Sequence, residues 1–314
     1  MTTISTKTEE KLNLDLYDKK ILFHLSQNAR IPTTTLAKKL KISQPRLKYK
    51  IKRLKDNLIS PTIFFNYPLL NINSYIILLE KLSKKSIEKI MKSDSIYFFM
   101  QSIGKYKWCL NILTNNIDSF LTNELKDEEF EIQPIIKTYA DNYNPYKLEI
   151  KPKKLEKDTK TELKSKDYTL LKHLSKNPTN NLITIQEKSG IDRQTCKNKI
   201  RIYEKNNIIQ KFRYSINVFK MGFITYLIKI KLPSNLKTEA LKTIRSNNFS
   251  GFVFESYNSF TMHYLPNNHT QLFNFIESIE KINEKIQIEV MQNTEFFKVD
   301  MIPQSVIKEF ESRI

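Results

Sequence analysis

The chain has 314 residues, 40% of them hydrophobic, which is enough for more than one globular domain with a packed core. It carries 52 Lys and Arg against 33 Asp and Glu, a formal net charge of +19. This excess is unusual for a metabolic enzyme and indicates a polyanionic partner such as DNA, RNA or an anionic membrane surface. The four glycines do not form a nucleotide-binding motif.

The cysteines and the apolar runs indicate the cellular compartment of the protein. Cys109 and Cys196 lie far apart in apolar stretches, so we predict buried free thiols rather than a disulfide framework. No apolar run approaches the length of a membrane span, and the N-terminal MTTISTKTEEK lacks the apolar core of a signal peptide. We therefore predict a cytoplasmic protein without a membrane partner.

The predicted elements near the N-terminus are repeated 149 residues later. DKKILFHLSQN at 18–28 returns as DYTLLKHLSKN at 167–177, and 14 of the 42 positions between 18 and 59 are identical to their counterparts. In the first copy, a short helix at 33–41 and a second helix at 44–57 are joined by a tight turn. Ser43 is placed to cap the second helix, as Asp192 is in the second copy. This arrangement is typical of a helix-turn-helix.

The second helix of each motif has one apolar stripe and one polar face. Leu47, Ile51 and Leu54 recur at helical spacing and should face the core, and Cys196, Ile200 and Tyr203 do so in the second copy. The opposite face carries donors suited to base edges and phosphates. The predicted DNA contacts are Gln44, Arg46, Lys48, Tyr49, Lys52 and Arg53 in the first copy, and Arg193, Gln194, Lys197, Asn198 and Arg201 in the second.

Each motif is followed by a β-rich segment and then by strand, helix, strand, strand, helix and strand. The β-rich segments at 58–67 and 208–216 are predicted wings that flank the DNA groove with Lys211 and Arg213. The order after them predicts a four-stranded sheet with two helices, the ferredoxin-like arrangement. Its hairpin turns fall at Gly104 and Asn258, residue types that tolerate positive φ. The expected strands and helices lie at 74–82, 84–93, 95–103, 106–114, 116–127 and 132–140, and at 223–232, 236–247, 251–257, 260–265, 269–284 and 286–297.

The predicted fold class is α+β, with two winged helix-turn-helix domains each followed by a ferredoxin-like sandwich domain. A lysine-rich segment with few apolar residues separates the two copies and is typical of a solvated linker. The predicted divisions are 14–68 and 69–150 for the first pair of domains, 151–165 for the linker, 166–217 and 218–300 for the second pair, and 301–314 for a C-terminal helix.

The stretch LDLYDKKILFHLSQNARIPTTTLAKKLKISQPRLKYKIKRLKDNLIS resembles the start of an Lrp/AsnC-type transcriptional regulator. The residues that carry the resemblance are Leu14, Asp15, Asp18, Ile21, Leu22, Leu25, Asn28, Ala29, Arg30, Leu36, Ala37, Ser43, Lys50, Arg53 and Leu54. The ferredoxin-like parts resemble the ligand-sensing domain of that family. The resemblance implies a sequence-specific regulator that binds double-stranded DNA, with two recognition helices in successive major grooves.

Two departures from the family are informative. Members usually carry one module per chain and pair as dimers, so two fused, unequal modules imply an internal pseudo-dimer with an asymmetric pair of half-sites, while a further homodimer stays open. The sensing-domain turn is normally G-x-x-D, but the two copies read GKYK at 104–107 and NSFT at 258–261. The missing acid argues against an amino-acid effector.

Two other functions compete with DNA binding. The chain also resembles the siroheme decarboxylases, which share this tandem build, and 208–223 has some likeness to their basic-aromatic segment. Those enzymes need His and Arg around a tetrapyrrole carboxylate. The four histidines here are His24, His173, His263 and His269, and the first three are predicted to be surface or packing residues. An RNA-binding sheet would need exposed aromatics on its central strands. We expect no enzyme, cofactor or metal site.

Overall fold

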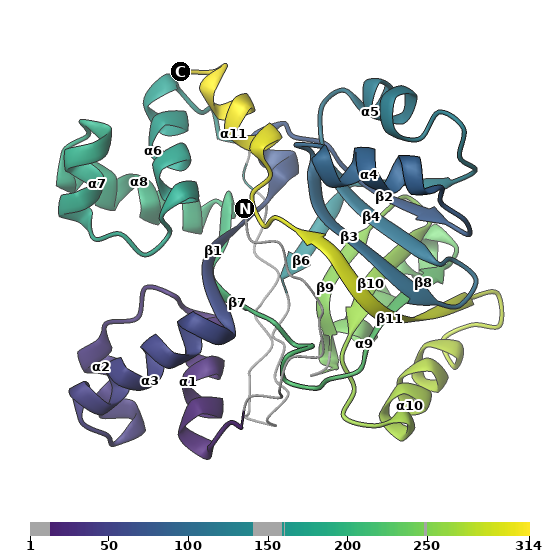
Figure 1. Cartoon of the computed structure of the whole chain (residues 1–314), viewed down its shortest axis with the longest axis horizontal. Coiled ribbons are helices and arrows are strands. Elements are labelled where there is room, and N and C mark those ends of the chain that lie inside the picture. Colours follow the sequence, from purple (N-terminus) through teal and green to yellow (C-terminus); the bar gives the residue numbers. More distant parts are fainter. Residues whose placement is uncertain (1–12, 141–158, 160, 248–249) are drawn as a thin grey trace. The chain divides into compact units, whose positions relative to one another are not determined.

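The computed structural model describes residues 13–140, 159, 161–247 and 250–314. The chain forms two units, and each unit combines segments from both sequence copies (Figure 1). Of the described residues, the helical unit comprises 13–69, 159, 161–222 and 307–314, and the sheet unit comprises 70–140, 223–247 and 250–306. The N-terminal segment and most of the predicted linker at 151–165 lie outside the described residues.

The helical unit contains the same three-helix succession twice. Both predicted caps form: Ser43 Oγ accepts from the Arg46 amide at 3.4 Å, and Asp192 Oδ1 accepts from the Thr195 amide at 3.1 Å. The first set is α1 (Leu16–Gln27), α2 (Thr33–Leu40) and α3 (Gln44–Asn57), and the second is α6 (Ser165–Lys176), α7 (Leu182–Ser189) and α8 (Arg193–Lys205).

The two predicted wings pair with each other, a partnership that was not predicted from the sequence, and their place beside a DNA groove stays a prediction. Strand β1 (Ile59–Phe65) pairs antiparallel with β7 (Ile209–Ile216) in a two-stranded sheet of their own. Arg213 stands opposite Thr62, and both Lys211 and Arg213 are half-buried. Alternating apolar residues correctly indicated two strands, but the period of two says nothing about which strand is the partner. The ribbon joins the two three-helix sets, which lie at its two ends (Figure 1).

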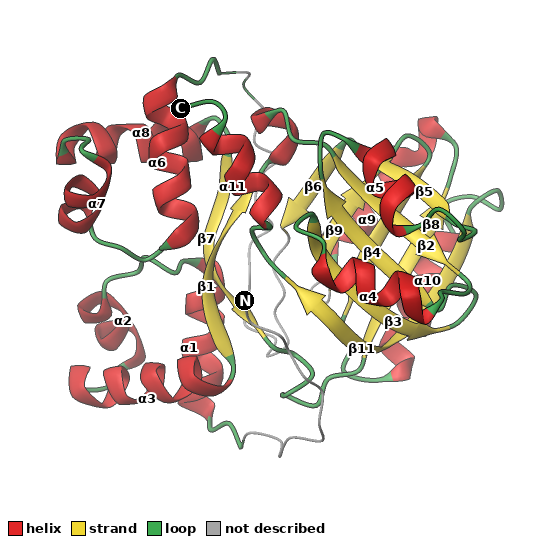
Figure 2. Ribbon diagram, turned by 45° about the horizontal axis from the view of Figure 1, so that its top comes forward, coloured by secondary structure: helices red, strands yellow, loops and turns green. Residues whose placement is uncertain are grey.

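The sheet unit contains one nine-stranded sheet, drawn in yellow in Figure 2. Its strand order is β5-β2-β4-β3-β11-β8-β10-β9-β6. The four main strands of each copy are neighbours in the order expected for a ferredoxin-like sheet. The strands are β2 (Ser74–Leu79), β3 (Ile96–Ile103), β4 (Trp108–Leu113), β5 (Glu131–Ile135), β6 (Lys137–Ala140), β8 (Thr225–Lys231), β9 (Ser250–Glu255), β10 (Ser259–Tyr264) and β11 (Gln287–Val299).

The two copies are joined strand to strand within this sheet. The first part of β11 pairs with β8 of its own copy, and the second part pairs with β3 of the other copy, with Val299 opposite Phe98. In the reverse direction, β6 leaves the first copy and pairs with β9, with Tyr139 opposite Val253. The last strand of each copy therefore completes the sheet of the other.

Helices cover each copy's strands and enclose a separate core. Helices α4 (Lys84–Lys92) and α5 (Ile117–Glu124) pack over a cluster that includes Ile90, Phe99 and Phe120. Helices α9 (Lys237–Ser246) and α10 (His269–Glu280) pack over a cluster that includes Ile244, Phe260 and Phe275. The remaining described elements are the 3-10 turns η1 (Tyr67–Leu70) and η2 (Ser234–Leu236) and the C-terminal helix α11 (Gln304–Glu311).

The two hairpin turns differ in backbone conformation. Gly104 has φ +145°, and a Cβ there would lie 3.0 Å from the carbonyl oxygen of Val290, so glycine is required. Asn258 is not among the described residues with positive φ, so that part of the prediction was wrong. Its carbonyl instead accepts from the Leu232 amide at 3.0 Å, which holds the turn against β8. Both cysteines are buried and free, as predicted.

Candidate nucleic-acid interface

Helix α3 turns five of its six predicted DNA contacts outward. Leu47 and Leu54 are fully buried and Ile51 is half-buried, so the predicted core stripe is correct. Tyr49 is 69% exposed although it is a large aromatic residue. The exposed predicted contacts are Gln44, Arg46, Lys48, Tyr49 and Lys52. This face therefore presents an amide, three cations and a phenol to the surroundings.

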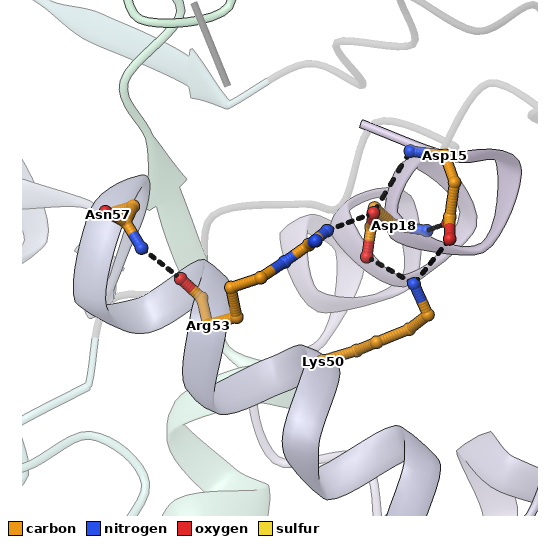
Figure 3. A network of polar contacts seen from close by, with 5 residues as sticks. All are labelled: Asp15, Asp18, Lys50, Arg53 and Asn57. Atoms are coloured by element: carbon orange, nitrogen blue, oxygen red, sulfur yellow. Dashed lines mark hydrogen bonds and ion pairs between the residues drawn. The ribbon is translucent and has the colours of Figure 1, made fainter. Parts of the chain in front are cut away.

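The opposite side of α3 is fixed to the start of α1 by a buried ionic network (Figure 3). Lys50 Nζ donates to Asp18 Oδ1 at 3.0 Å and to Asp15 Oδ2 at 2.6 Å. The Asp18 side chain is 0% exposed and the Lys50 side chain is 8% exposed. Lys50 is therefore an internal anchor, although it stands within the basic run of the sequence.

Arg53 is engaged in the same network. Its guanidinium forms an ion pair with Asp18, and its side chain is 35% exposed. Its carbonyl accepts from Asn57 Nδ2 at 2.8 Å (Figure 3). Arg53 therefore does not join the outward set. Arg46 is exposed but oriented, because its guanidinium carbon lies 5.0 Å from the centroid of the Tyr17 ring.

The network favours the charged forms of Lys50 and Asp15. Burial disfavours the Lys50 cation, but hydrogen bonds to Asp15 and Asp18 outweigh burial and raise the pKa of Lys50. Burial likewise opposes ionisation of Asp15, but the hydrogen bond from Lys50 lowers the pKa of Asp15 to about 2. A carboxylate and an ammonium that stay ionised hold α3 in one orientation relative to α1.

Helix α8 presents its polar face in the same way. The predicted stripe of Cys196, Ile200 and Tyr203 is buried. Behind the helix, Asp167 forms an ion pair with Lys199 and accepts from the Tyr203 hydroxyl at 2.5 Å. All five predicted contacts of this helix are exposed: Arg193, Gln194, Lys197, Asn198 and Arg201.

The anchoring pair was absent from the sequence-based set of candidate residues, although the repeat contained a signal for it. Asp18 and Asp167 occupy equivalent positions, as do Lys50 and Lys199, and both pairs are identities at the 149-residue offset. An acid at the start of one helix and a cation near the middle of a later one are identical in both copies because they contact each other. Identity alone did not separate Lys50 from its exposed neighbour Lys48, because Lys48 and Lys197 are also identical at this offset.

The sheet unit contains a pocket of about 440 Å³ beside a second ionic network. Lys229 Nζ donates to Glu131 Oε2 at 2.6 Å and lies 3.1 Å from Glu289 Oε2. Burial opposes ionisation of Glu131, but hydrogen bonds from Lys229 and Tyr106 lower its pKa to about 2. These charges neutralise one another within the protein. The described residues contain no group of three or more acidic, His or Cys side chains that could hold a metal ion.

No helix in the described part of the chain has the length and apolar character needed to cross a bilayer. The histidines that the enzyme alternative would require are dispersed. His24 and His173 are half-buried on α1 and α6. His263 is buried in the sheet unit against the rings of Phe98 and Phe254, and burial lowers its pKa to about 4. This environment is an aromatic packing site.

Comparison with known proteins supports the interpretation of the first copy. The family described as "Winged helix-turn-helix DNA-binding" matches residues 14–57. The HTH-type transcriptional regulator LysM of Saccharolobus solfataricus is 29% identical over 130 residues, which is 40% of this chain and 90% of that protein. LysM of Sulfurisphaera tokodaii is 28% identical over 130 residues, again 40% of this chain and 91% of that protein.

A solved structure resembles nearly the whole chain. The siroheme decarboxylase NirDL aligns with a TM-score of 0.58 over 94% of this chain and 97% of its own, at 10% identity. At that identity the likeness shows the fold alone, which is an α+β fold shared over nearly the whole length of both chains. The sequence matches and the exposed, capped α3 agree on a narrower statement, which is that residues 14–57 are similar to the winged helix-turn-helix DNA-binding family.

Proposed function

We propose that this protein is a sequence-specific transcriptional regulator that binds double-stranded DNA through α3 and α8 in successive major grooves. One observation carries the proposal: two helices expose cations and amides on one face and are fixed from behind by equivalent Asp–Lys pairs. A recognition helix needs hydrogen-bond donors on its exposed face, and it must be held rigidly by the rest of its domain, because contacts with base edges depend on the orientation of the helix. The second three-helix set acts in this proposal as a second helix-turn-helix.

The β1–β7 ribbon supports joint action by the two helix sets. Besides the strand pairing, the Ala29 amide donates to the carbonyl of Phe212 at 2.9 Å, and Arg30 Nη1 donates to the carbonyl of Pro178 at 3.0 Å. Each set is therefore bonded to an element of the other copy. We propose that the chain acts as its own pseudo-dimer, with half-sites about one helical turn (~34 Å) apart.

Neither alternative has comparable support. An enzyme of the siroheme decarboxylase type would need histidines around a tetrapyrrole carboxylate, whereas His263 is enclosed by phenylalanine rings and His24 and His173 lie half-buried on α1 and α6. An RNA-binding sheet would need exposed aromatics, but Phe98 on β3 and Phe254 on β9, which lie outside the two helix-covered cores, are buried as well. The visible spectrum of the protein after mixing with iron-uroporphyrin tests the first alternative. We expect no shift of the tetrapyrrole band.

Binding to duplex DNA and to single-stranded RNA across a salt series tests the proposal directly. If 6–10 phosphates are neutralised, affinity for duplex should fall roughly 10³- to 10⁵-fold between 50 and 200 mM salt. Site selection from random duplexes should then yield a motif. Failure to bind duplex at low salt, or equal binding of any sequence, would count against a sequence-specific regulator.

Replacing Lys48 and Lys52 together by Glu should abolish duplex binding, because the double change puts two negative charges on the outward face of α3. The matched control is Lys84→Glu with Lys85→Glu on α4, two exposed lysines in the sheet unit. Both variants lower the net charge equally. Equal loss of binding in the two variants would mean that overall charge, and not α3, determines affinity.

A further inference from the structure

The two outward helices present different chemistry at equivalent positions. Gln194 and Asn198 stand one turn apart on α8, and both are exposed. The equivalent positions on α3 hold Pro45 and Tyr49, which have no amide. Gln44, the amide on the exposed face of α3, is the first residue of that helix and is equivalent to Arg193. Paired amides are therefore a feature of α8 and not of α3.

The two amides on α8 are already bonded to each other. Gln194 Nε2 donates to Asn198 Oδ1 at 3.3 Å. The carbonyl oxygen of an amide has two acceptor sites and its nitrogen has two donors. Asn198 therefore keeps one acceptor and both donors for a ligand, and Gln194 restricts the rotation of the Asn198 side chain. This restriction lowers the ordering cost of a contact made by Asn198.

Adenine is the base that this arrangement fits. In the major groove adenine shows an acceptor at N7 and a donor at N6, and an asparagine amide pairs with both at once. Nδ2 of Asn198 would donate to N7, while the remaining acceptor site on Oδ1 would take the N6 proton. Gln194 would stay bonded to Oδ1 as a positioning residue. Guanine presents two acceptors at this edge and does not match.

Helix α3 is equipped for a different task. Its exposed Arg46 guanidinium is held against the Tyr17 ring. Lys48 and Lys52 are cations suited to phosphate, and Tyr49 offers a hydroxyl and a ring. Such contacts fix position and affinity but discriminate little between base pairs. We infer that α8 reads an adenine through Asn198 held by Gln194, whereas α3 mainly anchors the protein on the backbone. The inference rests on the proposed DNA-binding function. It implies that the half-site bound by α8 is more restricted in base sequence than the half-site bound by α3.

Site selection with the wild-type chain and three variants tests this inference: Asn198→Ala, Gln194→Ala and Tyr49→Ala. Wild type should enrich a motif with a fixed A·T pair in one half-site. Asn198→Ala should lose that preference and bind the selected site about 5- to 100-fold more weakly. Gln194→Ala should keep the preference in weakened form. Tyr49→Ala should lower affinity for all duplexes and leave the fixed pair unchanged.

The outcomes separate this inference from the proposed function. If wild type binds no duplex, the regulator proposal fails and the base assignment fails with it. If wild type selects a motif that Asn198→Ala selects equally well, DNA binding stands and the assignment to α8 is overturned. If Tyr49→Ala and not Asn198→Ala loses the preference for the fixed A·T pair, α3 is the helix that reads this base. Thermal melting of each variant confirms folding, and both amides are exposed, so we expect no change in melting temperature.

Discussion

In both helix sets an aspartate of the first helix fixes the third helix, but the groups that this aspartate binds differ between the sets. In the first, Asp18 binds two cations of α3, Lys50 and Arg53, and Asp15 supplies a second carboxylate. In the second, Asp167 binds one cation, Lys199, and the neutral hydroxyl of Tyr203. The position equivalent to Asp15 is Lys164. The first anchor is therefore richer in charge and more deeply buried than the second.

This difference changes how the basic run should be interpreted. Two of the cations on α3 neutralise acids inside the protein and cannot also neutralise phosphates. On α8 the position equivalent to Arg53 is Ile202, which is exposed, so the outward cations are Arg193, Lys197 and Arg201. The helix that looks more basic in sequence thus loses more of its charge to its own fold. Counts of Lys and Arg overestimate the charge available to DNA.

The largest effect should come from removing the first anchor. Asp18→Asn leaves Lys50 and Arg53 short of a counter-charge and should cost about 3 kcal/mol of local stability. Asp167→Asn should cost only about 1 kcal/mol, because the Lys199 side chain is 26% exposed and can turn to water. Hydrogen exchange measured on the full chain should show protection in α1–α3 falling roughly 100-fold in Asp18→Asn.

The control for this comparison removes the buried one of the two uncompensated charges, since the Arg53 side chain is 35% exposed and can turn to water. Asp18→Asn combined with Lys50→Met replaces the buried ion pair with neutral groups of similar size, and such exchanges are often close to neutral. Protection of α1–α3 should recover in large part. Equal losses in Asp18→Asn and Asp167→Asn would show that the two anchors do not differ as their burial suggests.

A smaller effect should separate internal from DNA-facing arginines. Arg201→Met should reduce the slope of log K against log salt by about 1, as expected when one phosphate contact is lost. Arg53→Met should leave the slope unchanged, because Asp18 already neutralises that guanidinium. Fluorescence anisotropy titrations of one selected duplex at several salt concentrations measure both slopes. A reduced slope in Arg53→Met would return Arg53 to the DNA-contacting set.

Much of the fold could be predicted because local rules determined it. The caps at Ser43 and Asp192 and the apolar stripes fixed the helix bounds, and the strand–helix order of each copy indicated the order of the strands. Pairing between distant segments could not be predicted. The β1–β7 ribbon and the exchange of β6 and β11 depend on which strand meets which, and alternation in sequence does not encode the partner.

The candidate site was predictable to a similar extent. Helical periodicity located the outward residues, since a buried stripe fixes the opposite face. It did not separate Arg53 from that face, because a long side chain at the margin of a helix can reach either solvent or a neighbouring acid. The partner of Arg53, Asp18, lies 35 residues away in sequence. The Gln194–Asn198 bond was likewise unpredicted, although the spacing of four residues permits it.

The smallest predicted effect concerns the turn before each outward helix. Lys41 ends α2 in the left-handed region with φ +53°, whereas its equivalent Gly190 ends α7 with φ +69°, and a Cβ at residue 190 would meet no neighbouring atom within 4 Å. A side chain in this region costs about 1 kcal/mol, and glycine avoids that cost. Lys41→Gly should therefore stabilise α1–α3 slightly, and Gly190→Lys should destabilise α6–α8 by about 1 kcal/mol. Hydrogen exchange resolves the two sets within one sample. A side chain at residue 190 meets open space, so only backbone strain should lower the stability of the Gly190→Lys variant. A loss of stability far above this value would show that the turn contributes more than backbone strain. No loss would show that the two turns are equivalent despite their sequences.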